Sequence, residues 1–438
     1  MRPTFDTTAD AKSMLNPGEW LAKSDLPVTT SLIHETQVVK QLLFFAPNIL
    51  PALGSAPAST RMAQQPIAIV GAGLAGLTLA RCLLQRGIPT VLLEKVASSP
   101  RHSYGITLHP WAYKPLLQVL QMDERTFRRR IAVDGPVGGI GRLDPDALAV
   151  TQEADSSSFR ANRAKIESLL REGLDIRWDH ALTDVKGTPE GVILSFANGQ
   201  RLGSSLAIGA DGVHSQMRKL LLPKSSFSVL PFVVFNGKRR VSQSSFRELF
   251  APYFDESNLV EMRRDEVLLQ VSVNENTGGD VNISYTYSRP ARKEDALHNP
   301  DRPTSGATDI PEEFYIEVAD LASLKQPFAE AFDVTKIRRD RVLHWLMRSV
   351  IVGLAELQRL ANDGVVLVGD AVHAMPILGG EGANAAIADG MELAEHLASH
   401  GSGGIADWYQ ARYDRWSDEM QRSEETLVLM HSDQRSVL

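Results

Sequence analysis

A carboxylate and several glycines in the last third of the sequence have a spacing that suits ligand binding. Asp370 closely follows the apolar run 365–368, which is typical of a buried parallel strand. A carboxylate at the C-terminal edge of such a strand can accept hydrogen bonds from the hydroxyls of a sugar or sugar alcohol. Gly379 and Gly382 keep side chains out of the loop that follows, and a helical pattern resumes at Ala383. The N-terminal N–H groups of that helix would favour negative charge in the loop.

A glycine pattern at residues 71–76, GAGLAG, indicates a second place for a ligand. It follows a short apolar strand and opens the predicted helix 74–86, as G-x-G-x-x-G does in dinucleotide-binding folds. Gly71 would make the tight turn, and Gly73 would let the backbone approach a pyrophosphate. Gly76 would let the helix pack closely on the strand.

Glu94 indicates which dinucleotide this loop would bind. It directly follows the second predicted strand, 90–93. There its carboxylate would accept hydrogen bonds from an adenosine ribose and would repel a 2′-phosphate. The pattern therefore predicts FAD or NAD(H) rather than NADP(H).

Three motifs together resemble those of the class A flavin-dependent monooxygenases, the para-hydroxybenzoate hydroxylase family. The segment containing Gly369-Asp370 and the glycine loop resembles the family's GD motif. Residues 209–218, GADGVHSQMR, are similar to its DG motif, G-A-D-G-x-x-S-x-x-R. We expect a helix over residues 159–170, in which Arg163 matches the family's R-x-x-L-x-x-x-L helix.

The resemblance implies that FAD is the bound cofactor. It implies that Asp370 holds the ribityl chain, that Asp211 lies near the flavin and diphosphate, and that Arg163 approaches the pyrophosphate. A guanidinium suits that position because it can pair with phosphate oxygens bidentately. The residues expected to bind the cofactor are Gly71, Gly73, Ala75, Gly76, Glu94, Lys95, Arg163, Asp211, Asp370, Pro376, Gly379, Gly382, Ala383 and Asn384. We assign no catalytic residue and no metal ligand.

The composition is that of an ordinary soluble globular protein, with 438 residues, 43% of them hydrophobic and 23% charged. A net charge of -7 argues against a nucleic-acid partner. The single cysteine, Cys82, cannot form an intramolecular disulfide, and we expect a cytoplasmic location. Residues 38–53 are too short for a membrane span, which needs about 20 apolar residues, but they could contact a membrane surface peripherally.

The expected fold class is α/β, a Rossmann-like FAD-binding domain with an inserted β-sheet substrate domain. Strand patterns such as 281–287 predict the inserted sheet, whose aromatic residues could line a pocket or fill a core: Phe232, Phe235, Tyr285 and Tyr287. The domain division that we expect is a weakly ordered N-terminal extension (1–61), a first FAD-binding part (62–225), a substrate or lid domain (226–341), a second FAD-binding part (342–400) and a C-terminal helix region (401–438).

These features predict a monooxygenase that uses NAD(P)H and O2 to hydroxylate or epoxidise a small organic secondary metabolite of aromatic or polyketide/alkaloid type. A flavin-dependent halogenase is one alternative, although the W-x-W-x-I-P signature is absent and the nearest tryptophan, Trp345, is isolated. A non-catalytic flavin-fold binding protein is another, which would not need the GD loop. His373 is interpreted as a structural hydrogen-bonding residue. The sequence leaves open the substrate, the choice of NADH or NADPH and the oligomeric state.

Overall fold

The computed structural model describes most of the chain after residue 64. The described residues are 65–98, 103–140, 158–225, 227–254, 257–321, 323–379 and 381–432. The expected N-terminal extension, 1–61, and its apolar segment 38–53 lie outside them.

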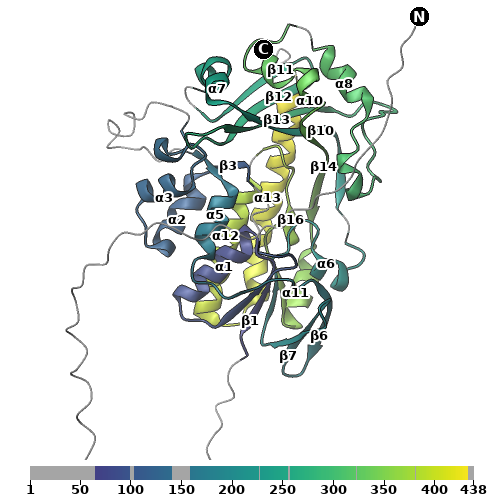
Figure 1. Cartoon of the computed structure of the whole chain (residues 1–438). Coiled ribbons are helices and arrows are strands. Elements are labelled where there is room, and N and C mark those ends of the chain that lie inside the picture. Colours follow the sequence, from purple (N-terminus) through teal and green to yellow (C-terminus); the bar gives the residue numbers. More distant parts are fainter. Residues whose placement is uncertain are drawn as a thin grey trace, which may run out of the picture. The chain divides into compact units, whose positions relative to one another are not determined.

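A five-stranded parallel sheet carries the segments that were predicted to bind a dinucleotide (Figure 1). Side by side, its strands are β15 (Val365–Leu367), β9 (Ala207–Gly209), β1 (Ile67–Val70), β2 (Thr90–Leu93) and β5 (Ile176–Arg177). Every neighbouring pair is parallel. Ala68, Ile69 and Val366 are fully buried, as expected of strands that are covered on both faces.

Helices α1 (Leu74–Gln85) and α12 (Gly382–His400) pack against each other and share one apolar core with this sheet. Gly390 permits their close approach, because a Cβ at this position would lie 2.7 Å from the carbonyl oxygen of Ala75. The remaining elements of this part are α2 (Pro110–Leu120), α3 (Glu124–Ile131), α5 (Arg163–Arg171), α6 (Gln216–Leu221), α11 (Leu354–Asn362) and the antiparallel strands β6 (Leu182–Thr188), β7 (Gly191–Phe196) and β8 (Arg201–Ser204).

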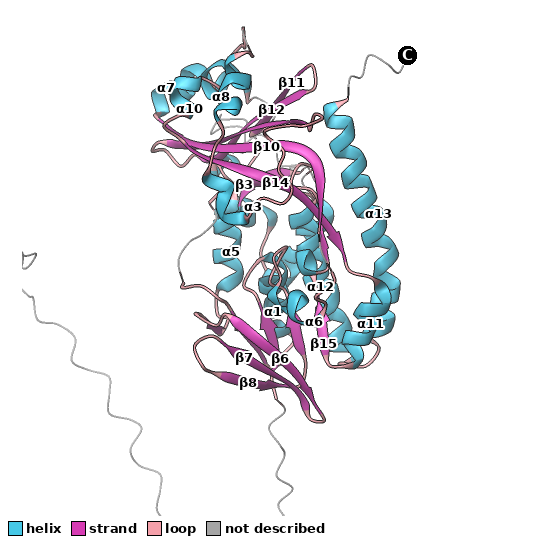
Figure 2. Ribbon diagram, turned by 90° about the vertical axis from the view of Figure 1, so that its right-hand side faces the viewer, coloured by secondary structure: helices cyan, strands magenta, loops and turns pink. Residues whose placement is uncertain are grey.

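A six-stranded antiparallel sheet forms the second layer (Figure 2). In spatial order its strands are β11 (Leu259–Arg264), β12 (Val267–Glu275), β13 (Val281–Pro290), β10 (Ser228–Val241), β14 (Arg341–Ile351) and β16 (His373–Ala374). Because β16 belongs to the segment after Asp370, its pairing with β14 fastens this sheet to the predicted cofactor loop.

The two faces of the six-stranded sheet differ in what covers them. One face packs Phe235, Tyr285 and Tyr287 into a core with α8 (Glu312–Ala319), α9 (Phe328–Ala331) and α10 (Val334–Ile337). These three aromatic side chains therefore fill a core. The opposite face, which we call the inner face, packs Phe232 and Trp345 in a smaller apolar cluster with Leu427 of the long helix α13 (Ile405–His431). Figure 2 shows α13 running alongside both sheets.

A two-stranded ribbon lies between the layers, and here one sequence prediction is wrong. Phe159–Asn162 forms strand β4, and the expected helix over 159–170 begins only at Arg163. The reason is non-local: β4 pairs with β3 (Gly105–Leu108), a partner that a local pattern does not identify. Asn162 then caps α5, because its side-chain oxygen accepts a hydrogen bond from the N–H of Lys165.

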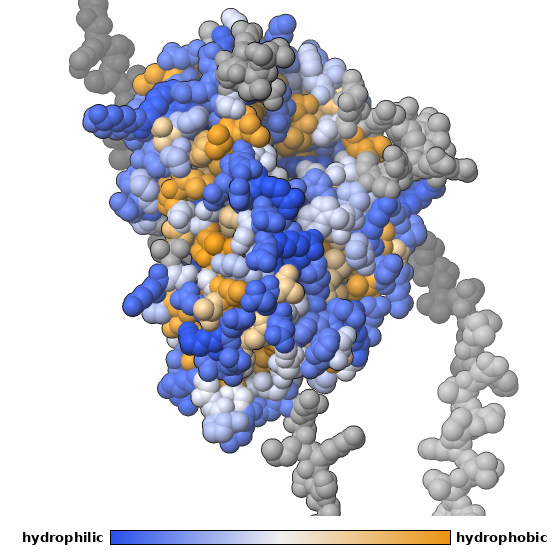
Figure 3. Space-filling model, turned by 180° about the vertical axis from the view of Figure 1, so that it is seen from behind, coloured by the Kyte–Doolittle hydropathy of each residue, from blue (hydrophilic) through white to orange (hydrophobic). Residues whose placement is uncertain are grey.

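None of the helices in the described part of the chain combines the length and apolar character that a membrane span needs. On the face drawn in Figure 3, apolar side chains are interspersed with polar ones.

Candidate functional site

The parallel sheet brings four predicted segments to one edge. Gly71 follows β1, Glu94 follows β2, Asp211 lies two residues after β9, and Asp370 lies three residues after β15. Since these strands are parallel, their carboxyl ends share the edge at which α/β sheets bind ligands. Segments separated by almost 300 residues of sequence thus form one site.

The glycine loop leaves open space where a ligand could approach. A Cβ at Gly71, whose φ is +111°, would lie 2.4 Å from the carbonyl oxygen of Ala210, and a Cβ at Gly76 would lie 2.0 Å from that of Gly71. By contrast, a Cβ at Gly73 would meet no atom within 4 Å. Gly71 and Gly76 are therefore needed for packing, whereas the open side of Gly73 fits the close approach of a pyrophosphate.

The two carboxylates nearest this loop are partly used by the backbone. Glu94 is buried, and its Oε2 accepts a hydrogen bond of 2.9 Å from the N–H of Ala72. Oδ2 of Asp211 accepts hydrogen bonds from two N–H groups at the start of α6. Oδ1 of Asp211 is buried and has no hydrogen-bond partner among the described residues. An unpaired buried acceptor is costly, so this oxygen fits a site that a ligand completes.

Asp370 lies in the short turn Gly369–Ala371, beside the first residue of α12. A Cβ at Gly382 would lie 3.9 Å from Oδ1 of Asp370, which places this half-buried carboxylate near the positive end of the helix. Burial raises the pKa of Asp370, and the electrostatic attraction of His373 and Arg163 opposes this effect only in part. Within the described residues, its carboxylate forms no side-chain hydrogen bond. It is therefore available to accept a hydrogen bond from a cofactor hydroxyl.

Arg218, the last residue of the DG motif, links two of these segments. Its NH1 group donates to the carbonyl oxygen of Ala371 at 2.8 Å, and its NH2 group donates to that of Val213. Arg218 thus holds the turn that carries Asp370 against the loop after β9.

The predicted residues around the start of α12 have mixed environments. Asn384 is fully buried; its side-chain oxygen accepts from the N–H of His109, and its side-chain NH2 group donates to the carbonyl oxygen of Thr107. Pro376 is buried and Ala383 packs against the core, while Gly379, with a φ of +117°, lies against α13. These bonds fix the entry to α12 against β3.

Two further predicted residues, Arg163 and Lys95, have surroundings other than those expected of pyrophosphate ligands. The guanidinium of Arg163 donates to Glu167 and to the hydroxyl of Tyr104, and Lys95 is exposed. Ala75 packs against Gly369. A Cβ added at Gly369 would lie 2.9 Å from the Cβ of Ala75, so the contact needs glycine at this position.

Sequence reasoning missed a buried polar cluster that supports the turn. Asp389, fully buried in α12, accepts hydrogen bonds from the N–H of Gly369, from Nε2 of His373, from the guanidinium of Arg412 and from the indole N–H of Trp416. The interpretation of His373 as a structural hydrogen-bonding residue is confirmed. A signal did exist, since an acid within an apolar helical stretch needs a partner, but the partners lie on α13 and could not be identified locally.

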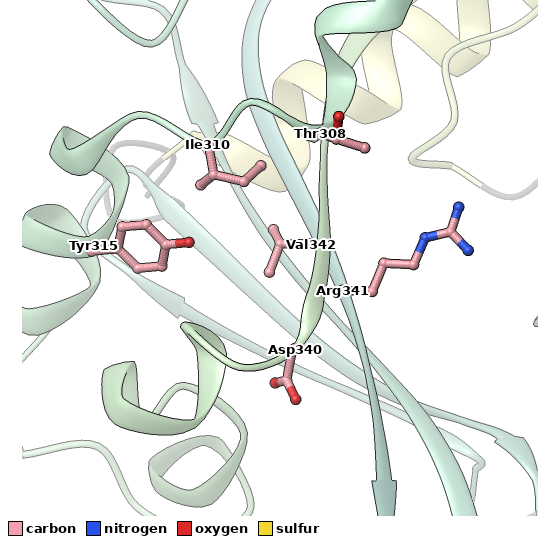
Figure 4. A pocket seen from close by; sticks show the side chains of 6 residues that line it. All are labelled: Thr308, Ile310, Tyr315, Asp340, Arg341 and Val342. Atoms are coloured by element: carbon pink, nitrogen blue, oxygen red, sulfur yellow. The ribbon is translucent and has the colours of Figure 1, made fainter. Parts of the chain in front are cut away.

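A surface hollow of about 410 Å³ lies away from this site (Figure 4). Asp340, one of its lining residues, already accepts hydrogen bonds from Arg239 and Tyr285. No residue predicted to bind the cofactor lines this hollow. In the described part of the chain, no group of three or more His, Cys, Asp or Glu side chains could hold a metal ion.

Comparisons with known proteins agree with this geometry. The model of the family "FAD binding domain" matches residues 64–248 and 323–424. The FAD-dependent monooxygenase nscC of Aspergillus fumigatus is 33% identical over 84% of this chain and 95% of its own length. The FAD-dependent monooxygenase adaC of Aspergillus niger is 32% identical over 84% of this chain and 94% of its own length.

Among solved structures, 2,6-dihydroxypyridine-3-hydroxylase from Arthrobacter nicotinovorans has a similar fold. Its TM-score is 0.64 at 18% identity, over 85% of this chain and 95% of that one. A parallel-sheet edge suited to a dinucleotide, an inserted antiparallel sheet and these relatives all lead to one assignment. The chain belongs to the class A FAD-dependent monooxygenases.

Proposed function

We propose that the chain uses NAD(P)H and O2 to hydroxylate or epoxidise a small organic secondary metabolite of aromatic or polyketide/alkaloid type. The observation that carries the proposal is the position of Asp370. Its carboxylate is unpaired among the described residues and lies near the start of α12, and the chain after Asp370 continues into β16, which pairs with β14 of the inserted sheet. A cofactor held there would have the inner face of that sheet nearby.

In this proposal the four strand-end segments hold the FAD. Gly73 admits the pyrophosphate, Glu94 accepts hydrogen bonds from the adenosine ribose, and Asp370 accepts from a ribityl hydroxyl. Arg163 reaches the pyrophosphate by exchanging its present contacts with Glu167 and Tyr104 for phosphate oxygens. Asp211, which has a free buried oxygen, completes the set.

FAD, once reduced by the nicotinamide cofactor, supplies the activation of O2 that the protein's own side chains cannot provide. The protein's contribution is electrostatic and geometric. The N-terminal N–H groups of α12 favour the negative charge that reduction brings. The apolar cluster of Phe232 and Trp345, which packs against α13, excludes water from this part of the inner face.

Two further parts of the proposal concern the setting of the protein. The one cysteine, Cys82, is buried and reduced, which fits a reducing compartment, so we infer a cytoplasmic location. Small molecules are its partners in this proposal: the substrate, O2 and a transient nicotinamide cofactor.

The first test is purification followed by a substrate screen. The protein should purify with close to one FAD per chain, and one class of aromatic or polyketide compound should stimulate oxidation of NADH or NADPH with consumption of O2. Mass spectrometry of the product should show a gain of one oxygen atom from ¹⁸O2. A flavin-loaded protein that gives a chlorinated product with chloride, and no oxygenated product, would favour the halogenase alternative.

A further inference from the structure

Arg160 is a partly buried cation for which the proposed FAD site has no use. It lies on β4, directly opposite Thr107 of β3 in the ladder. Its NH1 group donates to the hydroxyl of Thr107 at 3.1 Å, and its NH2 group donates to the hydroxyl of Ser272 at 3.3 Å. Its Nε is buried and has no hydrogen-bond partner among the described residues. Within the described part of the chain, two of the five N–H donors of this guanidinium therefore have a partner.

Among the residues that the structure describes, no carboxylate accepts a hydrogen bond from Arg160. Burial lowers the pKa of Arg160 to about 10, and Glu261 opposes this effect only from a distance. Two other arginines that are buried have carboxylate partners: Arg289 donates to Asp295 and Glu317, and Arg412 donates to Asp389. Holding a partly buried charge without a counterion costs stability, so its retention points to a function.

The surroundings of Arg160 place it where the two layers meet. β3 contacts both β12 and α12, and the carbonyl oxygen of Thr107 accepts a hydrogen bond from the side chain of Asn384 in the first turn of α12. Gly105 makes room for the guanidinium, since a Cβ at Gly105 would lie 2.6 Å from Nε of Arg160. The guanidinium thus lies between the inner face and the helix start beside Asp370.

The inner face of β12 is polar near Ser272 and apolar near Leu268. Ser272, Gln270 and Leu268 alternate with residues of the other face, so they lie in one row. This row leads from the Arg160 contact at Ser272 to the apolar cluster of Leu268, Phe232 and Trp345. Four residues of strand span roughly 13 Å. A molecule with fused rings and one charged oxygen would match both ends.

We propose that Arg160 is the anion-binding residue of the substrate site, and that the substrate is a fused-ring or conjugated compound with a carboxylate or an ionised hydroxyl. This inference rests on the proposed function and makes its substrate class specific. In the complex, the free N–H donors of Arg160 donate to the anionic oxygen while the rings lie along the row towards Leu268. Thr107 and Ser272 are positioning residues, because their hydroxyls hold the guanidinium.

The test measures binding without turnover. The FAD-loaded protein is titrated with 2-naphthoate, with 1-naphthol above and below its own ionisation, and with the neutral methyl 2-naphthoate, and the flavin absorbance change and the melting temperature are followed. The variants are Arg160→Gln, Arg160→Lys and Ser272→Ala. Arg247→Gln, an exposed arginine on α7 (Gln243–Leu249), is the matched control.

We expect the wild type and Arg247→Gln to bind at least one anionic probe about 10- to 100-fold more tightly than the ester, the range for a charge-assisted hydrogen bond. Preference for the naphthoate identifies a carboxylate site, and preference for naphtholate identifies an ionised hydroxyl site. Arg160→Gln should lose the preference, Arg160→Lys should keep part of it, and Ser272→Ala should weaken it. Without a probe, Arg160→Gln should melt at the same or a higher temperature, because a partly buried charge without a counterion is removed.

Three results would overturn the inference. The first is a wild type that binds no anionic probe better than the ester at millimolar concentration. The second is an Arg160→Gln protein that keeps the preference. The third is an Arg160→Gln protein that loses FAD and melts well below the wild type, since Arg160 would then serve the cofactor or the fold. Failure of the proposed function is a separate result, namely no oxygenated product from any compound, and it leaves the binding data interpretable.

Discussion

Replacing Asp389 with Asn should destabilise the protein and loosen the turn that carries Asp370. The carboxylate of Asp389 is fully buried, and the guanidinium of Arg412 donates to it at 2.7 Å. Asn has the same shape but no charge, so Arg412 would keep only the more exposed carboxylate of Glu392. The new NH2 group would also face a donor: the N–H of Gly369 if it replaces Oδ2, or the indole N–H of Trp416 if it replaces Oδ1.

The magnitude follows from the loss of a buried ion pair. Breaking such a pair by removing one partner costs about 3–5 kcal/mol. With about 2.1 cal/mol/K of unfolding entropy per residue and about 340 described residues, this cost corresponds to a fall in melting temperature of roughly 4–7 °C. The exposed Asp414, also on α13, provides the matched control Asp414→Asn, which should change the melting temperature by less than about 1 °C.

The pH dependence gives a second measurement with a defined sign. Burial by itself would raise the pKa of Asp389. The ion pairs and hydrogen bonds of Asp389, chiefly those with His373 and Arg412, outweigh this effect and hold its pKa well below its usual range. A carboxylate whose pKa is depressed by folding contributes its full stabilisation at pH values above its unfolded-state pKa, which is near 4. This stabilisation is lost as the pH falls towards the folded-state pKa. The difference in stability between the wild type and Asp389→Asn should therefore be full at pH 7 and shrink below about pH 4.

The assay is thermal unfolding followed by release of flavin fluorescence, with FAD content measured after gel filtration. Asp389→Asn should lose more FAD than Asp414→Asn, because the cluster that holds the turn at Gly369 is weakened. If Asp389→Asn melts within about 1 °C of the wild type at pH 7 and retains its FAD, the buried cluster does not support the turn.

Four further outcomes are expected. Asp370→Ala should fold but retain little FAD after gel filtration, and full FAD content with normal turnover would contradict its proposed role. Gly73→Ala should fold but bind FAD weakly, because its Cβ would point into the open space that the cofactor needs. Gly71→Ala should yield little folded protein, because its Cβ would lie 2.4 Å from a carbonyl oxygen. Soluble yield and flavin content distinguish the two variants. Gly382→Val should lower the flavin reduction potential by weakening a helix-terminus effect of about 0.3–2 kcal/mol, and an unchanged potential with unchanged turnover would show that this helix does not face the ring. A chain that starts at Met62 should fold and keep FAD because β1 begins five residues later, and a flavin-free product beside a normal full-length control would disprove this.

The contrast between Glu94 and Asp389 shows how far local sequence reasoning reaches. Glu94 follows a strand and a glycine loop in sequence, so its place at the sheet edge can be predicted from neighbours alone. Asp389 lies within an apolar helical stretch, and its partners on α13 follow more than 20 residues later. Gly369, whose N–H donates to Asp389, precedes it by a similar number of residues. Contacts of this kind depend on how helices pack, which no local period encodes.

The sequence by itself determined the strand-turn-helix units, the glycines that only a backbone turn requires, and the carboxylates at strand ends. It did so because these features depend on neighbouring residues and on backbone sterics. The tertiary structure decided that β4 is a strand rather than the start of a helix, because its hydrogen bonds come from β3. It also decided that Arg160, which lies between two layers, donates to hydroxyls and to no carboxylate of the described residues. Whether a charge is paired depends on side chains brought together from distant segments, so only the folded chain could show it.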